Sequence, residues 1–331
     1  MTTSTVFEAP APTARTNSDF EADVVVAQRR DEANGVVSVE LSLPGGSPLP
    51  AWTPGAHIDV ELPGGLTRQY SLCGDPADTT RWRLGVLREA EGRGGSRWVA
   101  EELTVGTTLR VRGPRNNFPL QTAARYVFLA GGIGITPLLP MIRAAEAAGA
   151  DWVLHYGGRT RASMAFLGEL SEYGQRVRVC PQDETGLLDL DAALGSPAAD
   201  TLVYCCGPTG LLDAVAARCA DWPSGALRVE RFTAAPVVHD GADTGFEVVC
   251  ERSGLTVTVA PEQSILRAVE DAGIDVLSSC TEGICGTCET TVVEGEPDHR
   301  DSLLTDDEKA AGDTMMICVS RCRGARLVLD L

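Results

Sequence analysis

The pattern of apolar and polar residues divides the chain into three segments with different periodicity. In residues 19–122, short stretches of alternating apolar residues are separated by turns rich in glycine and proline; examples lie at 21–27, 36–43, 57–62 and 81–87. Several short strands separated by turn signals predict an antiparallel β-barrel. Residues 1–18 are rich in Thr, Ser, Ala and Pro and lack an apolar stretch, so they are expected to be disordered.

The segment 123–233 has continuous apolar stretches in place of the alternation, as expected for strands buried on both faces. These stretches lie at 126–130, 152–156, 177–180 and 202–206, and the last of them is expected to be the final strand of the segment. Helical stretches at 137–148 and 211–220 come between or after them. Strands that alternate with helices predict an α/β domain with an open parallel sheet.

A linker at residues 234–244 leads to the third segment, 245–331. This segment opens with two alternating apolar stretches on either side of a turn at Arg252-Ser253-Gly254, which predicts a β-hairpin. Ser264 then precedes apolar positions with helical spacing, so it is expected to cap a helix.

The charge is spread unevenly over these segments. The 331-residue chain has a formal net charge of −18 at pH 7, and residues 240–331 contain 19 acidic and 7 basic residues. An acidic surface repels nucleic acid and anionic lipid. It either steers a basic protein partner or only aids solubility.

Two further features bear on location. The longest uncharged stretch, residues 126–142, is interrupted by glycine and proline and is too short to span a membrane. The chain has eleven cysteines and no secretory signal, which predicts a reducing, cytoplasmic location with thiols used as ligands or core residues.

The cysteines of the third segment carry the most specific signal. Cys280, Cys285 and Cys288 have the C-x4-C-x2-C spacing of a plant-type [2Fe–2S] cluster, which needs a distant fourth cysteine. Gly283 and Gly286 allow the loop to bend around such a cluster. The alternatives are a structural zinc site, which prefers paired C-x2-C elements, and unrelated core thiols.

Two elements of the barrel segment suggest an anion site with an aromatic wall. Arg68-Gln69-Tyr70-Ser71-Leu72 follows a candidate strand, and on its own it could be an ordinary strand with an exposed arginine. The turn Gly92-Arg93-Gly94-Gly95-Ser96 precedes a helical stretch at 97–103. A glycine-rich turn at a helix start presents backbone N–H groups to a phosphate, and Arg68 could pair with that phosphate.

A second glycine loop, at residues 131–137, follows the first strand of the α/β segment. Thr136 is expected to cap the next helix, with Pro137 at its first position. The glycines would let the backbone approach a pyrophosphate, although a plain strand-to-helix turn is the alternative.

These motifs and their order resemble the phthalate dioxygenase reductase family, a group within the ferredoxin–NADP reductase superfamily that includes vanillate demethylase reductase. The resemblance covers nearly the whole chain after residue 20. It implies a multidomain fold with an antiparallel β-barrel flavin domain, an α/β parallel-sheet nicotinamide domain and a β-grasp (α+β) ferredoxin domain at the C-terminus.

The resemblance also implies the site residues. Cys318, rather than the nearby Cys322, becomes the fourth cluster ligand. FMN is expected at Arg68, Gln69, Tyr70, Ser71, Val86, Leu87, Gly94, Gly95, Ser96, Thr136 and Phe232. NADH is expected at Gly131, Gly132, Gly134, Thr136, Arg159, Cys206, Gly207 and Pro208. The residues expected at the reacting atoms are Ser71, Cys206 and Phe232. NADPH stays open, because Arg159 and Arg161 could accept a 2′-phosphate.

The function that the resemblance implies is that of an NAD(P)H-dependent oxidoreductase. Hydride would pass from the nicotinamide to FMN, and single electrons would pass through the 2Fe-2S cluster to a Rieske non-haem iron oxygenase that hydroxylates or O-demethylates an aromatic compound. The acidic ferredoxin segment, with Glu282 and Glu289 near the cluster loop, would dock this partner. The alternatives are electron donation to a cytochrome P450, a stand-alone flavin reductase and a redox-responsive binding protein.

Overall fold

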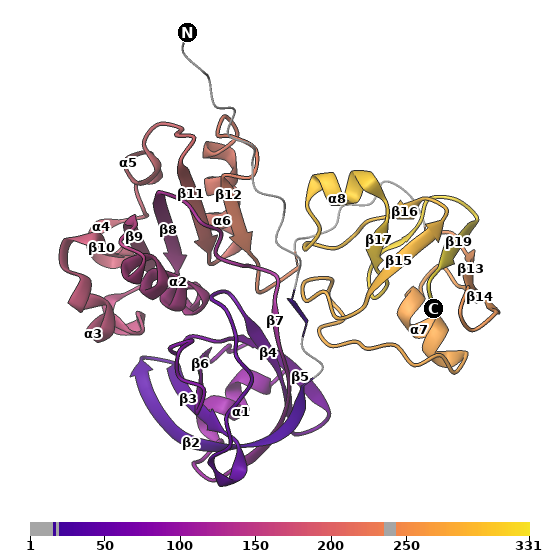
Figure 1. Cartoon of the computed structure of the whole chain (residues 1–331), viewed down its shortest axis with the longest axis horizontal. Coiled ribbons are helices and arrows are strands. Elements are labelled where there is room, and N and C mark those ends of the chain that lie inside the picture. The colour runs from indigo at the N-terminus through magenta and orange to yellow at the C-terminus, as the bar shows by residue number, and fades with distance from the viewer. Residues whose placement is uncertain (1–15, 18–19, 235–242) are drawn as a thin grey trace.

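The computed structural model describes residues 16–17, 20–234 and 243–331, and it contains three units, each built around one main sheet (Figure 1). Most of the expected disordered start and most of the expected linker lie outside the described residues. Within that start, Thr16–Asn17 instead form a short strand, β1, which pairs with Arg115 and Asn116. In Figure 1 the N-terminal unit lies at the bottom, the parallel sheet at the upper left and the C-terminal unit at the right.

The first unit is a curled antiparallel sheet with the order β5-β4-β7-β2-β3-β6, and β1 pairs with β7. A β-bridge between Leu72 and Leu84 joins its two ends, so the sheet closes into the predicted barrel. The motif that begins at Arg68 lies within β5 rather than after a strand. The elements are β1 (Thr16–Asn17), β2 (Glu21–Ala33), β3 (Val36–Ser42), β4 (His57–Leu62), β5 (Leu66–Ser71), β6 (Trp82–Leu87), α1 (Gly95–Glu101) and β7 (Thr108–Asn116).

The second unit is a parallel sheet with the order β10-β9-β8-β11-β12. The chain runs outward from β8 in one direction and then returns to β11 on its other side, so the strand order switches between β8 and β11. The elements are β8 (Arg125–Gly131), α2 (Ile135–Ala147), β9 (Asp151–Gly158), α3 (Leu167–Leu170), β10 (Val177–Pro181), α4 (Gln182–Thr185), α5 (Leu190–Leu194), β11 (Thr201–Cys206), α6 (Thr209–Arg218) and β12 (Leu227–Glu230).

The parallel sheet differs from the sequence prediction in one strand. The prediction that β11 is the last strand is wrong, because β12 follows it. The residues of β12 are mostly partly exposed, so this edge strand lacks the continuous apolar pattern of its neighbours.

The third unit has a mixed sheet with the order β14-β13-β19-β15-β17 and a separate pair, β16 and β18. The predicted hairpin is β13 with β14, and the predicted cap is confirmed, because Ser264 Oγ accepts a hydrogen bond from the Arg267 N–H at 3.1 Å. The elements are β13 (Phe246–Cys250), β14 (Leu255–Val259), α7 (Ile265–Asp271), β15 (Glu289–Glu294), β16 (Pro297–Asp298), α8 (Asp306–Ala311), β17 (Thr314–Met316), β18 (Arg321–Cys322) and β19 (Arg326–Leu329).

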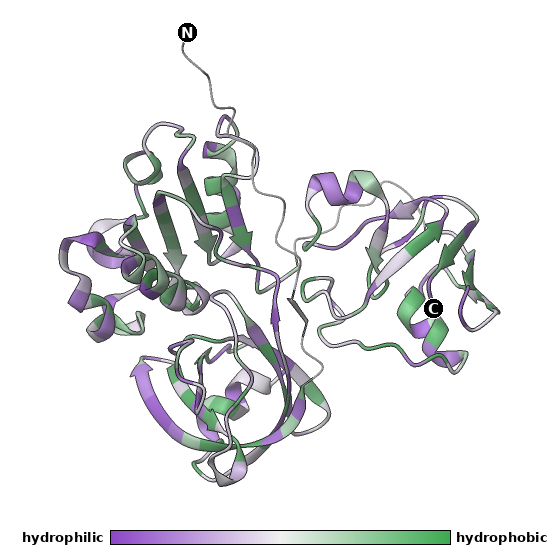
Figure 2. Cartoon of the chain, viewed as in Figure 1, coloured by the Kyte–Doolittle hydropathy of each residue, from purple (hydrophilic) through white to green (hydrophobic). Residues whose placement is uncertain are grey.

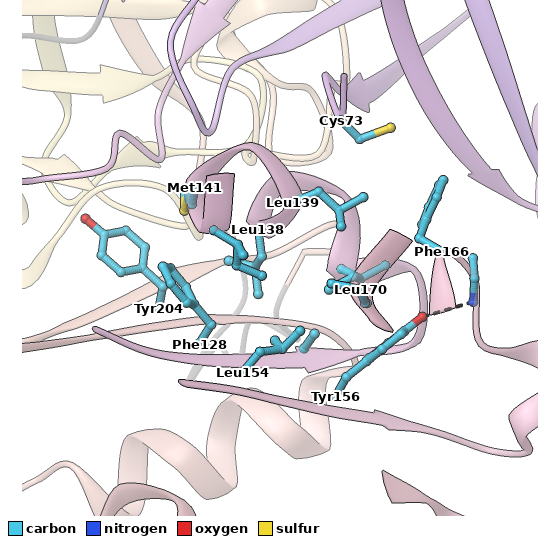
Figure 3. Packing of buried hydrophobic residues seen from close by; sticks show 14 of the residues in the cluster. Cys73, Phe128, Leu138, Leu139, Met141, Leu154, Tyr156, Phe166, Leu170 and Tyr204 are labelled. Carbon is cyan, nitrogen blue, oxygen red and sulfur yellow. Dashed lines mark hydrogen bonds between the residues drawn. The ribbon is translucent and has the colours of Figure 1, made fainter. Parts of the chain in front are cut away.

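The hydrophobic cores join two of the three units. Apolar residues fill the strands of the parallel sheet (Figure 2), and the cluster against α2 also contains Val36, Cys73 and Phe118 from the N-terminal segment. Figure 3 shows Cys73 with this cluster, in which the Tyr156 hydroxyl accepts a hydrogen bond from the Ala165 N–H at 3.1 Å. The barrel and the parallel sheet therefore share a core, whereas the C-terminal unit has its own.

Candidate functional site

A cavity of about 440 Å³ opens where the three units meet. Its walls are contributed by β5, by the start of α1, by the end of β12 and by the cysteine loop of the C-terminal unit. The lining residues that the following paragraphs use include Arg68, Gln69, Tyr70, Ser71, Leu87, Gly95, Ser96, Thr136, Glu230, Phe232, Cys280 and Glu282. One cavity thus brings residues from all three segments within reach of a single ligand.

The barrel wall of the cavity holds buried polar atoms that lack a partner among the described residues. Arg68 Nη1 donates to the carbonyl of Thr67 at 2.8 Å, but Arg68 Nη2 and Tyr70 Oη have no hydrogen-bond partner. Burial raises the pKa of Tyr70 to about 12, so the phenol is neutral. Buried donors without partners point to a ligand that completes them. An anionic group at Arg68 with an aromatic ring system near Tyr70 fits this chemistry, as a flavin phosphate and ring would.

The start of α1 lies directly against Arg68. A Cβ atom at Gly95 would lie 3.0 Å from Arg68 Cγ, so the glycine allows the arginine to cross the first turn of the helix. Gly94 precedes the helix with a φ of +95°, a conformation that favours glycine.

Most of the expected flavin residues come together at this cavity, and two of them, Val86 and Gly94, do not line it. Arg68, Gln69, Tyr70, Ser71, Leu87, Gly95, Ser96, Thr136 and Phe232 all line it. The side chain of Val86 instead packs in the barrel core, because successive residues of a strand point to opposite faces and its neighbours Gly85 and Leu87 face the cavity. The side chain of Val86 therefore does not face the cavity, and its expected part in flavin binding stays a prediction.

The glycine loop after β8 meets the turn after β11 at the point where the strand order switches. A Cβ atom at Gly134 would lie 2.3 Å from the carbonyl oxygen of Cys206, and one at Gly131 would lie 2.6 Å from Pro208 Cδ. Open α/β sheets bind nucleotides at the carboxyl ends of their strands, at this switch point. The predicted nicotinamide residues on these two loops therefore lie against one another at the switch point.

Thr136 has a different role from the predicted one. The residues Gly132–Gly134 form a 3-10 turn that continues directly into α2, so the helix begins at Ile135 and Thr136 lies inside it. Its hydroxyl donates to the carbonyl of Ile133 at 2.9 Å, and a Cβ atom at Gly85 would lie 2.6 Å from its Cγ2. Thr136 therefore packs the helix start against the barrel rather than capping it.

Glu230 is a residue of the site that the sequence analysis missed. It ends β12 and lies beside the two predicted residues Ser71 and Cys206: the Cys206 thiol approaches Glu230 Oε2 at 3.9 Å, and the Ser71 hydroxyl also hydrogen-bonds the carboxyl group. Burial raises the pKa of Glu230 to about 8 and raises that of Cys206 well above its usual value. At neutral pH this group of three side chains is therefore uncharged.

The other two predicted nucleotide residues lie further out. Phe232 lines the cavity with 39% of its surface exposed, so its ring can cover a bound ligand. Arg159 is exposed just beyond β9.

One sequence signal could have identified Glu230 as a residue of the site, because it is a charged residue at the carboxyl end of a strand.

The four predicted cluster cysteines lie together and are all buried. Cys280 Sγ accepts a hydrogen bond from the Glu282 N–H at 3.3 Å, and Cys285 Sγ accepts one from the Thr287 N–H at 3.4 Å. Contacts with the Cys285 and Cys318 thiols, together with the Glu282 and Ile284 N–H groups, lower the pKa of Cys280 and favour its thiolate form. N–H donors aimed at sulfur are typical of iron–sulfur ligands.

The loop geometry also suits a two-iron cluster. Gly283 and Gly286 have φ angles of +70° and +76°, and a Cβ atom at Gly283 would lie 2.6 Å from Val319 Cγ2. In the described part of the chain, no three His, Cys, Asp or Glu side chains are arranged to hold a single ion. A [2Fe–2S] cluster instead takes two thiolates at each of two irons. Cys322 lies apart, where its sulfur accepts from the Gly324 N–H at 3.2 Å.

The cysteine loop is docked against the barrel unit. Arg93 Nη2 and Glu282 Oε1 form an ion pair at 2.7 Å, and Asn117 Nδ2 donates to the carbonyl of Cys285 at 2.8 Å. Glu282, which was expected to face a protein partner, lines the flavin cavity in this conformation, and its role in docking stays a prediction. The cluster position and the cavity therefore adjoin.

Together, the fold and the site define a reductase with a flavin-type barrel, a nicotinamide-type sheet and a plant-type ferredoxin unit. A family model for an oxidoreductase NAD-binding domain matches residues 128–217, and one for a 2Fe-2S iron-sulfur cluster binding domain matches residues 248–323. None of the helices in the described part of the chain has the length and apolar composition that a membrane span requires.

Comparison with whole proteins gives the family. The chain is 39% identical to phthalate dioxygenase reductase of Burkholderia cepacia over 92% of this chain and 96% of that protein. It is 42% identical to a vanillate O-demethylase oxidoreductase of Pseudomonas putida over 93% and 99%, respectively. The chain therefore belongs to the phthalate dioxygenase reductase family.

Solved structures agree with this assignment. The structure of phthalate dioxygenase reductase, described as modular for electron transfer from pyridine nucleotides to [2Fe-2S], matches with a TM-score of 0.70 at 38% identity over 95% of this chain and 98% of that chain. An intact type IV self-sufficient cytochrome P450 monooxygenase matches with a TM-score of 0.88 at 49% identity over 94% of this chain. The present chain spans 41% of that longer protein.

Proposed function

We propose that this chain is the reductase component of a multicomponent oxygenase, which oxidises NAD(P)H and delivers single electrons to an oxygenase that acts on an aromatic compound. The observation that supports this most strongly is the single cavity whose wall includes Arg68, Glu230 and the cluster cysteine Cys280. When bound, FMN accepts two electrons as hydride and releases them singly, and the 2Fe-2S cluster carries one electron at a time.

The protein residues have separable roles in this proposal. The residues 19–122 form the FMN domain, where Arg68 and the start of α1 bind the phosphate and Tyr70 packs beside the ring. The residues 123–233 form the NAD domain, where the loops after β8 and β11 bind the nucleotide. The residues 245–331 form the ferredoxin domain, in which Cys280, Cys285, Cys288 and Cys318 hold the cluster.

The group formed by Ser71, Glu230 and Cys206 sets the environment of the nicotinamide. Because Glu230 and Cys206 are neutral at pH 7, they place no fixed negative charge beside the nicotinamide. Hydride transfer needs no acid or base, so these side chains orient the ring and exclude water. Phe232 covers the site from the solvent side.

An anaerobic NADH titration of the purified protein, followed by visible absorbance, tests the proposed function. We expect the flavin and cluster bands to bleach together and to consume about three electrons per chain, two for FMN and one for the cluster. If only the flavin band bleaches, the relay to the cluster is absent, and a stand-alone flavin reductase explains the chain better.

We further propose a Rieske non-haem iron oxygenase as the electron acceptor, by analogy with the oxygenase systems named for the related reductases. A cytochrome P450 is the second candidate, because the fused P450 monooxygenase contains a region 49% identical to this chain. None of the eleven cysteines, all of which lie within the described residues, forms a disulfide bond, which supports a location in the reducing cytoplasm.

The partner is proposed to dock on the acidic ferredoxin domain near the cluster loop. Glu289, exposed at the start of β15, is better suited than Glu282 to test this, because reversal of Glu282 would also break the ion pair with Arg93. Glu289→Lys is expected to slow reduction of a Rieske oxygenase about tenfold at low salt and to leave ferricyanide reduction unchanged. Glu251→Lys, in the turn between β13 and β14, is the matched control. Equal slowing with both acceptors would contradict this docking site.

A further inference from the structure

Two arginines lie beyond the end of β9, and they have different surroundings. Arg159 is exposed and makes no side-chain ion pair with any residue that the structure describes. Arg161 is held by Glu184 in a two-pronged ion pair, with Nε 3.0 Å from Oε1 and Nη2 2.6 Å from Oε2. Only one of the two arginines that could accept a 2′-phosphate therefore has its guanidinium group available.

This ion pair lies at the edge of the sheet where the nucleotide crevice opens. β9 and β10 are parallel neighbours, with Pro181 opposite Gly158, so both strands end at the same edge. Glu184 lies in α4, directly after β10, and the Asp183 N–H donates to the carbonyl of Arg159 at 3.2 Å. In sheets of this kind the residues beyond the strands next to the phosphate loop bind the adenosine ribose.

The charges at this edge favour a ribose over a ribose phosphate. A guanidinium group binds a carboxylate or a phosphate through pairs of neighbouring N–H donors. Glu184 occupies the Nε–Nη2 pair of Arg161, and the negative charge of Asp183 also acts on Arg161. Arg161 in turn lowers the pKa of Glu184, so its carboxylate stays charged at neutral pH. An arriving phosphate dianion would have to displace Glu184, whereas a neutral 2′-hydroxyl could donate to a carboxylate.

We propose that Glu184 is a specificity-determining residue that directs this reductase to NADH and against NADPH, by occupying Arg161 and by repelling a 2′-phosphate. The proposal rests on the proposed nicotinamide-dependent function. It assigns the nucleotide preference to one exposed carboxylate on α4 rather than to the glycine loop after β8.

The test compares NADH and NADPH with ferricyanide as the acceptor in the holoprotein. The wild type is expected to have a kcat/KM that favours NADH. Glu184→Gln keeps the shape of the side chain and removes its charge, so kcat/KM for NADPH should rise about tenfold, whereas that for NADH should change less than about twofold. Adding Arg161→Ala to this variant should reverse the gain. Glu101→Gln, which removes the partner of Arg88 on the barrel, is the control and should change neither value.

A binding measurement separates this inference from the proposed function. Calorimetry with adenosine 2′,5′-bisphosphate and with 5′-AMP requires no electron transfer. Glu184→Gln should bind the bisphosphate about tenfold more tightly than the wild type and bind 5′-AMP equally. An unchanged affinity for the bisphosphate, or a wild type that uses both nucleotides equally, overturns the assignment of Glu184. A wild type that reduces ferricyanide with neither nucleotide overturns the proposed function, and the assignment with it.

Discussion

Cys285→Ser is expected to abolish cytochrome c reduction while NADH-dependent ferricyanide reduction continues. Cys285 is only 2% exposed and lies at the tip of the loop that Asn117 holds against the barrel unit. A serine hydroxyl is a far poorer ligand than a thiolate for an iron–sulfur cluster, so the cluster should be lost or loosely held. The flavin cavity is formed mainly by the other two units, so its own chemistry should persist.

The measurement is steady-state turnover with each acceptor, together with the visible and electron paramagnetic resonance spectra of the purified variant. We expect a loss on the order of 100-fold with cytochrome c and less than about twofold with ferricyanide. Cys322→Ser is the matched control, because Cys322 is a nearby thiol that hydrogen-bonds its own turn instead of facing the other cysteines. Cytochrome c reduction at the wild-type rate in Cys285→Ser would contradict the proposed relay.

Features coded by neighbouring residues were predictable from the sequence. The spacing of Cys280, Cys285 and Cys288 is imposed by one loop that wraps one cluster, so three ligands are visible as a single motif. The alternation of β13 and β14 and the cap at Ser264 likewise depend on a few adjacent residues. The periodicity of the first two segments was sufficient to predict an antiparallel barrel and a parallel sheet, whereas the sheet of the third segment was implied by the family resemblance.

Features that depend on packing between distant segments were not predictable. Glu230 joins Ser71 and Cys206 only because β12 lies beside β11 in the sheet and the barrel packs against that edge. The pairing of Glu282 with Arg93 depends on how the ferredoxin unit docks, which no local pattern records. Val86 and Thr136 show the same limit at a smaller scale. The side chain of Val86 points to the core because of the face of its strand, and Thr136 lies inside the helix because the helix begins one residue earlier.

The wild type is expected to become less stable as the pH rises from about 5 to about 8, and the Glu230→Gln variant is expected not to show this decrease. The carboxyl group has an ordinary pKa of 4.5, and burial in the cavity raises it to about 8 in the folded protein. Between these values the folded state keeps a proton that the unfolded state has released, so folding is progressively disfavoured as the pH rises through this window. Each pH unit costs at most about 1.4 kcal/mol of folding free energy.

The glutamine variant carries no such proton, so its melting temperature relative to the wild type should rise between pH 5 and pH 8 and stay constant above pH 8.

Flavin reduction by NADH, followed by stopped flow, tests the same carboxyl group through activity. If the neutral carboxyl group is the active form, the wild-type rate should fall about tenfold from pH 7 to pH 9, whereas the variant rate should be independent of pH. Glu101→Gln, at an exposed site on α1, should behave like the wild type in both measurements. The same pH dependence in wild type and Glu230→Gln would show that another group titrates and that Glu230 is not the buried neutral acid of the site.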